Sequence, residues 1–186
     1  MNNYGTKKLE TDRLVLRKFV IEDSDQMYSN FASDENVTTY FAFEPDKSID
    51  DTKEKITYWV KAYEKDNTYI WAIQDKKSNE LIGNITAEIP YKTLQTCEVG
   101  YSIGSKWWNR GYTTEALIAV IRYLLLEEDM YLIEAKHNSE NVASGKVLLK
   151  AGMTKEATLR DRRINKVTGK RGNLVVYSII KTEVNN

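Results

Sequence analysis

The 186-residue sequence predicts a single domain of mixed α/β (α+β) class, with about seven strands and about four helices. Two kinds of segment alternate along the chain: short alternating or β-branched runs typical of strands, and longer runs with apolar residues at helical spacing. Strand–helix–strand order in the second half indicates some parallel pairing, whereas the middle strands read as antiparallel hairpins. No repeat or linker-like stretch divides the sequence.

The first half of the chain is predicted to hold two helices between its first strand and a strand hairpin. Residues 13–17 alternate charged and apolar side chains, as a strand does. Residues 23–31 place apolar side chains at helical spacing, and a second helix is expected after Ser48, a favourable N-cap residue. Strands at 69–73 and 81–85 flank a turn-rich segment.

Residues 94–103 form the most informative predicted strand, because its two faces differ. Alternation places four apolar residues on one face, which we assign to the core, and four small or polar residues on the other, which can line a cavity. The core set is Cys97, Val99, Tyr101 and Ile103, and the polar set is Thr96, Glu98, Gly100 and Ser102.

The remaining elements alternate in type. They are a helix over 113–127, a strand over 131–135, a helix over 141–151 and strands over 153–160 and 174–181. The helix over 113–127 is apolar nearly all round, so we expect it to be buried. Gly152 follows the next helix as its expected C-cap.

Composition argues against several classes of function. The chain has 27 Lys and Arg against 27 Asp and Glu, and this zero net charge argues against a specific nucleic-acid partner. The single cysteine cannot form an internal disulfide, and there is no Cys/His set for a zinc ion, so no metal is expected. The polar N-terminus lacks the apolar core of a signal peptide, and no apolar stretch is long enough to span a membrane. We therefore expect a cytoplasmic protein with no membrane partner.

A loop over residues 104–114 joins the informative strand to the apolar helix. A helix N-terminus presents unpaired N–H groups that can hold a phosphate. Gly111 would let the backbone approach an anion closely, and Arg110 adds positive charge. The loop matches neither the Walker A pattern nor G-x-G-x-x-G, so adenosine triphosphate or a dinucleotide is not indicated. Spacing alone favours a plain glycine turn.

Residues 100–104 match G-x-S-x-G, the nucleophile elbow of serine hydrolases, and Asp129 and His137 follow in the required order. An elbow turns directly from strand into helix, whereas here the predicted helix begins about ten residues after Ser102. We therefore interpret the match as chance and expect His137 to be a solvated loop residue. Glu98 can act as a general base if it lines a closed cavity, although on its own it is more simply a surface carboxylate.

Several segments, in order, resemble the GNAT superfamily of acetyl-CoA-dependent N-acetyltransferases, specifically its RimJ/RimL-like branch. The resemblance runs from about residue 10 to residue 181 and leaves 1–9 and 182–186 as short tails. Residues 11–17 resemble the opening strand of the family, 98–103 with 108–116 its acetyl-CoA motif, 138–144 with 150–153 its second motif, and 177–179 its closing strand.

This resemblance implies a single GNAT-like domain that transfers an acetyl group from acetyl-CoA to a primary amine, foremost a protein N-terminal α-amine, as a monomer or homodimer. It implies Glu98 as the base that deprotonates the amine and Ser144 as the group that protonates or hydrogen-bonds the departing thiolate. The thioester carbonyl would be polarised by backbone N–H groups near Ser102 and Ile103. The implied cofactor-binding residues are Ser102, Ile103, Trp108, Asn109, Arg110, Gly111, Tyr112, Thr113, Thr114 and Asn141.

The sequence departs from the family pattern at several positions. Trp108 and Thr113 fill the ends of the six-residue phosphate-loop signature, as in the RimJ/RimL variant. Leu148 stands where many members place a tyrosine acid, and Asn173 where the branch often has an aspartate. Two alternatives stay open: an acetyltransferase of a small cationic amine, such as an antibiotic or a polyamine, and a non-catalytic acyl-CoA-binding module.

Charge is unevenly distributed along the chain. Residues 34–54 carry an excess of five negative charges, and residues 155–171 an excess of five positive charges. In the family fold both segments would flank the acceptor cleft. The acidic segment would then attract a cationic amine, and the basic segment could meet a phosphate or an acidic protein surface. Two ordinary solvated segments are the equally simple alternative.

Overall fold

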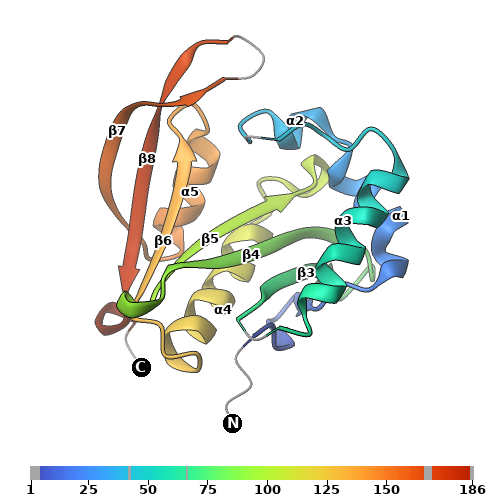
Figure 1. The fold of residues 1–186 in the computed structure, drawn as a ribbon, viewed down its shortest axis with the longest axis horizontal. Coiled ribbons are helices and arrows are strands. Elements are labelled where there is room, and N and C mark those ends of the chain that lie inside the picture. Colours follow the sequence, from blue (N-terminus) through green and yellow to red (C-terminus); the bar gives the residue numbers. More distant parts are fainter. Residues whose placement is uncertain (1–4, 42, 66, 166–168, 185–186) are drawn as a thin grey trace.

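The computed structural model describes residues 5–41, 43–65, 67–165 and 169–184. Over these residues the chain forms one eight-stranded sheet in the order β1-β2-β3-β4-β5-β6-β8-β7 (Figure 1). All neighbouring strands are antiparallel except β5 and β6, which are parallel. This sheet confirms the predicted class. The strands are β1 (Leu9–Glu10), β2 (Leu14–Arg17), β3 (Tyr69–Asp75), β4 (Leu81–Tyr91), β5 (Thr96–Ile103), β6 (Leu132–Asn138), β7 (Thr154–Ile164) and β8 (Arg171–Ile180).

Five helices accompany the sheet over the described residues: α1 (Ser24–Met27), α2 (Glu35–Thr38), α3 (Ile49–Ala62), α4 (Tyr112–Leu126) and α5 (Val142–Lys150). Helix α3 begins as its sequence predicts. The Ser48 hydroxyl accepts the Asp51 N–H at 3.3 Å, and the Asp51 carboxylate accepts the Ser48 N–H at 2.9 Å, which completes a capping box. None of the described helices has the length and apolar character needed to cross a bilayer.

The helix predicted over 23–31 forms, but it is irregular: a 3₁₀ turn leads into α1, which continues directly as a π turn over Tyr28–Ala32. Both the N–H and the hydroxyl of Ser33 donate to the Tyr28 carbonyl, at 3.2 and 2.7 Å. That carbonyl lies five residues back, which is π-helical spacing. The sequence prediction also missed α2, whose N-cap Asp34 accepts the Asn36 N–H at 2.9 Å.

The larger apolar core lies between the sheet and helices α4 and α5. Leu117, Val120, Ile121 and Leu124 recur at helical spacing on α4, and none is more than 2% exposed. Truncating one of them, as in Leu124→Ala, should cost about 2–5 kcal/mol of stability. Ile118 on the same helix is 39% exposed, so the expectation of burial all round holds only for one broad face.

A second, smaller core packs α1 and α3 against the other face of the sheet. Phe19, Met27, Phe31 and Ile56 are its largest fully or nearly fully buried members, and Ala72 and Leu81 bring β3 and β4 into it. Figure 1 shows these helices on one side of the molecule and β6, β7 and β8 on the other. The sheet between them forms the floor of the site described below.

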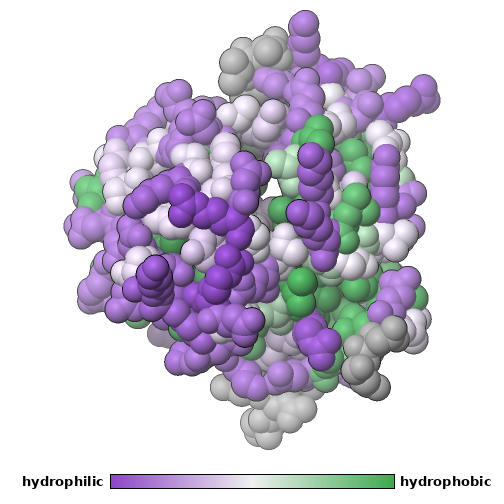
Figure 2. All heavy atoms as spheres, turned by 180° about the vertical axis from the view of Figure 1, so that it is seen from behind, coloured by the Kyte–Doolittle hydropathy of each residue, from purple (hydrophilic) through white to green (hydrophobic). Residues whose placement is uncertain are grey.

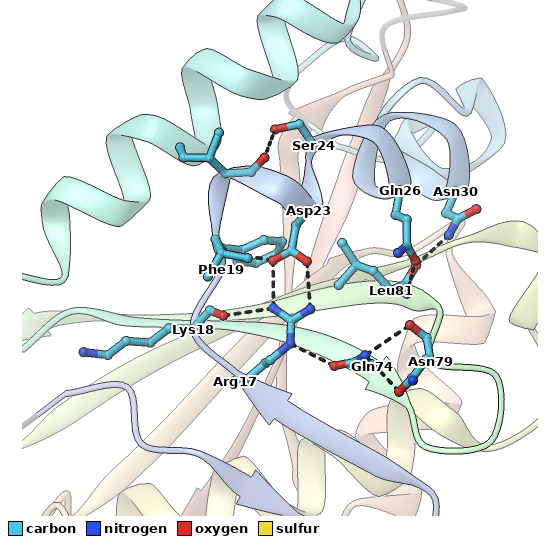
Figure 3. Close-up of polar contacts among 12 residues, drawn as sticks. Arg17, Lys18, Phe19, Asp23, Ser24, Gln26, Asn30, Gln74, Asn79 and Leu81 are labelled. Atoms are coloured by element: carbon cyan, nitrogen blue, oxygen red, sulfur yellow. Dashed lines mark hydrogen bonds and ion pairs between the residues drawn. The ribbon is translucent and has the colours of Figure 1, made fainter.

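Arg17 clamps the end of β2 to the turn that precedes α1 (Figure 3). Its guanidinium donates to both carboxylate oxygens of buried Asp23 at 2.7 Å, and to Gln74 of β3 at 2.8 Å. The hydrogen bonds to Asp23 raise the pKa of Arg17. Because Asn30 also donates to the Leu81 carbonyl at 2.8 Å, the first helical segment is held over β3 and β4.

Two predicted boundaries change. Residues 5–9 were expected as a tail, but they are held by the domain: the Thr6 N–H donates to Thr68, the Trp71 indole to the Lys7 carbonyl, and the Tyr123 hydroxyl to the Gly5 carbonyl. The last two strands are also longer than predicted, because β7 reaches 164 and β8 starts at 171. The β7–β8 hairpin therefore projects beyond the sheet (Figure 1).

Candidate active site

Strands β5 and β6 separate partway along their length. Their parallel pairing joins Thr96–Val99 to Leu132–Ala135. Beyond this register the two strands diverge, as Figure 1 shows. Parallel β-strands normally satisfy each other's backbone groups, so this divergence opens an edge of β5 along Gly100–Ile103.

Alternation along β5 decides which amides face this open edge. The Gly104 N–H donates to the Ile82 carbonyl of β4 at 2.9 Å, and Gly83 lies opposite Ile103. In an antiparallel ladder the hydrogen-bonded residues alternate, so Ser102 turns its amide toward β4, while Tyr101 and Ile103 turn theirs toward the opening. The amides of Tyr101 and Ile103 therefore face the open edge, whereas the sequence analysis named those near Ser102 and Ile103.

A cleft of about 830 Å³ lies over this part of the sheet. Its lining comes from β4, β5 and β6 on the floor, from α1, α3 and the α2 region on one wall, and from α5 on the other. Four predicted site residues line it: Glu98, Ser102, Asn141 and Ser144. Of the described residues, neither Ile103 nor any of 108–114 lines the cleft. Seen from the opposite side, the largely hydrophilic surface is hollowed near its centre (Figure 2).

Glu98 lies on the cleft floor in a row of acidic residues. It stands opposite Glu88 of β4 and beside Glu134 of β6. Lys136 lies between two of these carboxylates, 2.8 Å from Glu98 and 2.6 Å from Glu134. Burial opposes the charge of Lys136, but the hydrogen bonds that it donates to both carboxylates raise its pKa. Glu98 therefore faces the cleft as a carboxylate whose charge is compensated only in part.

Ser144 belongs to a hydroxyl pair at the other side of the opening. The Asn141 side chain caps α5 by accepting the Ser144 N–H at 3.2 Å. The Ser144 hydroxyl lies 2.8 Å from the Tyr101 hydroxyl, and burial raises the pKa of Tyr101 to about 12. The sequence analysis missed Tyr101 because alternation assigned it to the core face. At this point β5 leaves β6, so the core face borders the cleft.

The loop 104–111 follows the end of β5 and thus lies at the open end of the divergence. The Trp108 indole donates to the Ile103 carbonyl at 2.9 Å, which ties the loop to the strand. Asn109 and Gly111 have positive φ values of 59° and 79°, and Gly111 is the N-cap of α4 with no side-chain cap. The first intrahelical bond runs from the Glu115 N–H to Gly111. The amides of residues 112–114 therefore have no intrahelical partner.

Arg13, the residue before β2, contacts this loop. Its guanidinium lies 2.6 Å from a carboxylate oxygen of Glu115, donates to the Arg110 carbonyl at 2.9 Å, and lies 4.4 Å from the centre of the Tyr112 ring. Burial opposes ionisation of Glu115, but hydrogen bonds from Thr11 and Arg13 lower its pKa. The sequence analysis read Arg13 only as part of the first strand.

His137 is buried at 8% exposure inside β6, so the expectation of a solvated loop residue is wrong. Its Nδ1 lies 2.6 Å from the Asn138 carbonyl, and its Nε2 is buried with no hydrogen-bond partner among the described residues. Helix α5 crosses it at Gly145, where a Cβ would lie 2.9 Å from Nε2. Burial lowers the pKa of His137.

The serine-hydrolase arrangement is not formed. The Ser102 hydroxyl donates to the Asn84 side chain, His137 bonds its neighbour's carbonyl, and Asp129 pairs with Lys181 at 2.6 Å. These three groups make no hydrogen bond with one another in the described structure. Within the described part of the chain no three His, Cys, Asp or Glu side chains are grouped as a metal would require.

A mostly antiparallel sheet with one diverging parallel pair, a glycine-capped helix after the diverging strand and a polar cleft beside it together define an acyl-transfer type of site. The family model for the acetyltransferase (GNAT) domain matches residues 13–154. The chain therefore belongs to the GNAT family of acetyltransferases.

Three known proteins illustrate the similarity. The chain is 32% identical to the uncharacterized N-acetyltransferase YoaA of Bacillus subtilis, over 93% of this chain and 96% of that protein. It is 26% identical to the [ribosomal protein uS5]-alanine N-acetyltransferase of Escherichia coli, over 86% and 84%. Among solved structures, the microcin C7 self-immunity acetyltransferase MccE, in complex with acetyl-CoA and AMP, superposes with a TM-score of 0.81 at 20% identity, covering 91% of this chain and 93% of that one.

Proposed function

We propose that this protein transfers an acetyl group from acetyl-CoA to the N-terminal α-amine of a protein. The observation that carries the proposal is the open edge of β5. It presents the amides of Tyr101 and Ile103 beside a cleft that also holds a carboxylate, Glu98, and a hydroxyl pair. Acyl transfer to an amine needs these three functions: donors for a developing oxyanion, a base and a proton donor.

The loop and the helix N-terminus that follow β5 suit acetyl-CoA, the acetyl donor. The amides of residues 112–114, which have no intrahelical partner, and the positive end of the α4 dipole suit a pyrophosphate. Trp108, Asn109 and Arg110 precede Gly111 in the same loop, and Asn141, the N-cap of α5, lines the cleft. When bound, acetyl-CoA supplies an acyl thioester as the activated donor. This fit agrees with the acetyl-CoA held by MccE.

The two proton transfers of the reaction take place on opposite sides of the cleft: one removes a proton from the acceptor amine, and the other delivers a proton to the thiolate. Glu98 accepts the proton of the acceptor ammonium, directly or through a water molecule, because it is the floor carboxylate next to the open edge. On the opposite side, the Tyr101 and Ser144 hydroxyls share a hydrogen bond and hold a proton for the departing thiolate. The raised pKa of Tyr101 keeps its hydroxyl protonated at neutral pH.

The form of the cleft favours a chain end as acceptor. It has a volume of about 830 Å³, and a second pocket of about 420 Å³ shares part of its lining. An extended peptide can enter such a continuous channel with its α-amine toward Glu98, whereas a small amine would leave most of it empty. The uS5-alanine acetyltransferase, to which the chain is similar, is named for a protein acceptor.

Two measurements test the proposal. Calorimetry should show acetyl-CoA binding, and thiol release should be faster with N-terminal peptides than with spermidine or an aminoglycoside. Glu98→Gln should lower kcat about 10²–10⁴-fold without changing acetyl-CoA affinity. Glu134→Gln is the matched control, because it also contacts Lys136 but does not line the cleft, and it should change kcat by less than about threefold. Equal effects of the two variants would exclude Glu98 as the base, and turnover of small amines alone would exclude the peptide acceptor.

A further inference from the structure

The second pocket lies between the segment after α2 and the tip of the β7–β8 hairpin. Tyr40 and Phe41 form one wall, and the hairpin forms the other. Four residues line both this pocket and the cleft: Tyr40, Phe41, Asn138 and Arg163. Arg163 therefore stands where an acceptor seated in the cleft would continue into the second pocket.

The pocket wall on the hairpin is rich in arginine. Arg162, Arg163 and Arg171 line it, against one carboxylate, that of Asp161. Arg171 donates to the Asp161 carbonyl at 3.3 Å. Among the described residues, the side chains of Arg162 and Arg163 make neither an ion pair nor a hydrogen bond with the protein. Two guanidinium groups are thus left to meet an external anion, and a guanidinium fork matches carboxylate and phosphate geometry. Of the two lysines in this hairpin turn, Lys170 does not line the pocket, and Lys166 lies outside the described residues.

A β-bulge creates this arrangement. Leu159 pairs with Leu174 and Arg163 with Gly172, so four steps along β7 oppose two along β8. Asp161 adopts a left-handed φ of 56°, and its N–H donates to the Asn173 side chain at 3.2 Å. Bulges commonly re-aim side chains beside functional sites. Asn173, which stands where the branch often has an aspartate, therefore stabilises the bulge that precedes Arg163.

The channel formed by the cleft and the second pocket therefore carries opposite charges at its two ends. At one end Glu88 and Glu98 stand opposite each other on β4 and β5, and both line the cleft. At the other end stand the arginines of the hairpin. An acceptor with an ammonium at one end and an anion farther along matches both ends. Tyr40 and Phe41 line the arginine pocket on the side opposite the hairpin.

We propose that the acceptor is an acidic peptide, with its α-amine at Glu98 and an oxyanion-bearing side chain within its first few residues bound by Arg163. This inference rests on the proposed function and specifies its substrate class. The oxyanion is the carboxylate of Asp or Glu, or the phosphate of a phosphorylated serine, since a guanidinium binds both.

Binding of peptides that cannot react tests the pocket separately from turnover. N-acetylated pentapeptides would be titrated by calorimetry in the presence of CoA, with either Glu, Gln or phosphoserine at the third and fourth positions. The Glu peptide should bind about five- to tenfold more tightly than the Gln peptide, as a half-exposed charged hydrogen bond allows. The phosphoserine arm shows which oxyanion is preferred. The preference should shrink as salt rises.

Variants then locate the effect. Arg163→Gln should reduce the Glu-over-Gln preference to about twofold or less. Arg160→Gln is the matched control, because Arg160 is exposed on the same strand but does not line the pocket, and it should keep the full preference. Equal affinity of the wild-type protein for the Glu and Gln peptides would overturn the inference, as would a preference that Arg163→Gln leaves intact. If the acidic peptides bind selectively but their free-amine forms are not acetylated, the proposed function fails and the subsite stands.

Discussion

Replacement of Arg13 by lysine should weaken acetyl-CoA binding from a distance. Arg13 immediately precedes β2, and its guanidinium contacts the Glu115 carboxylate, the Arg110 carbonyl and the Tyr112 ring, which ties it to the loop before α4. Lysine keeps the charge but has no planar fork. It can keep one contact with Glu115, and it loses the carbonyl bond and the ring stacking. Each lost contact is worth about 1 kcal/mol before screening.

The two lost contacts together set the expected effect on acetyl-CoA affinity. Because the Arg13 side chain is 44% exposed, screening reduces the loss to about 1–2 kcal/mol. If the ligand must then order the loop, that free energy is subtracted from binding, and the Kd for acetyl-CoA should rise about five- to thirtyfold. Calorimetric titration at 25 °C measures this change directly, and a thermal melt shows that the variant is folded.

Arg17→Lys is the matched control, at the last residue of β2. Arg17 also forms a two-pronged pair, with Asp23, but its contacts lead to α1 and β3 and not to the loop. Its Asp23 partner is buried, so Arg17→Lys should lower Tm at least as much as Arg13→Lys while changing the Kd for acetyl-CoA by less than about twofold. An unchanged Kd in folded Arg13→Lys would refute the reasoning, and so would equal losses of affinity in both variants.

Three further outcomes are expected. Tyr101→Phe and Ser144→Ala should each lower kcat about 10–10²-fold, and the double variant should fall little further if the two hydroxyls act as one unit; additive losses in single-turnover kinetics would contradict this. Because the pKa of His137 is lowered in the folded protein, the unfolded chain takes up a proton first as pH falls, and the free energy of unfolding should fall below about pH 6.5. In urea titrations, His137→Asn should reduce the dependence of the unfolding free energy on pH. An unchanged dependence would mean that another group is responsible. Gly145→Ala gains about 1 kcal/mol of helix propensity but places a Cβ 2.9 Å from His137 and 3.2 Å from the Tyr177 hydroxyl, so overpacking should win and Tm should fall; a higher Tm would show that these side chains yield freely.

Local patterns were enough for most elements of the fold. Alternation along β5 separates its faces as predicted, with Cys97 and Val99 buried. The Ser48 cap starts α3, and Gly152 follows α5 with a φ of 88°, as a C-terminal glycine should. These features depend on residues within a few positions of one another, where backbone geometry and side-chain type decide the outcome. The π turn at Tyr28–Ala32 escaped prediction because the bond from the Ser33 hydroxyl to a backbone carbonyl competes with the regular helical pattern.

The candidate site depends on contacts between distant segments. Arg13 meets a loop 97 residues later, and Tyr101 meets Ser144 across 43 residues. His137 is buried because α5 crosses it, although its own neighbours in sequence are polar. By itself, therefore, the sequence determined the class of fold, most of its elements and the segments that carry the chemistry. Only the tertiary structure decided which side chains meet, because periodicity specifies the faces of an element but not the element that packs against each face.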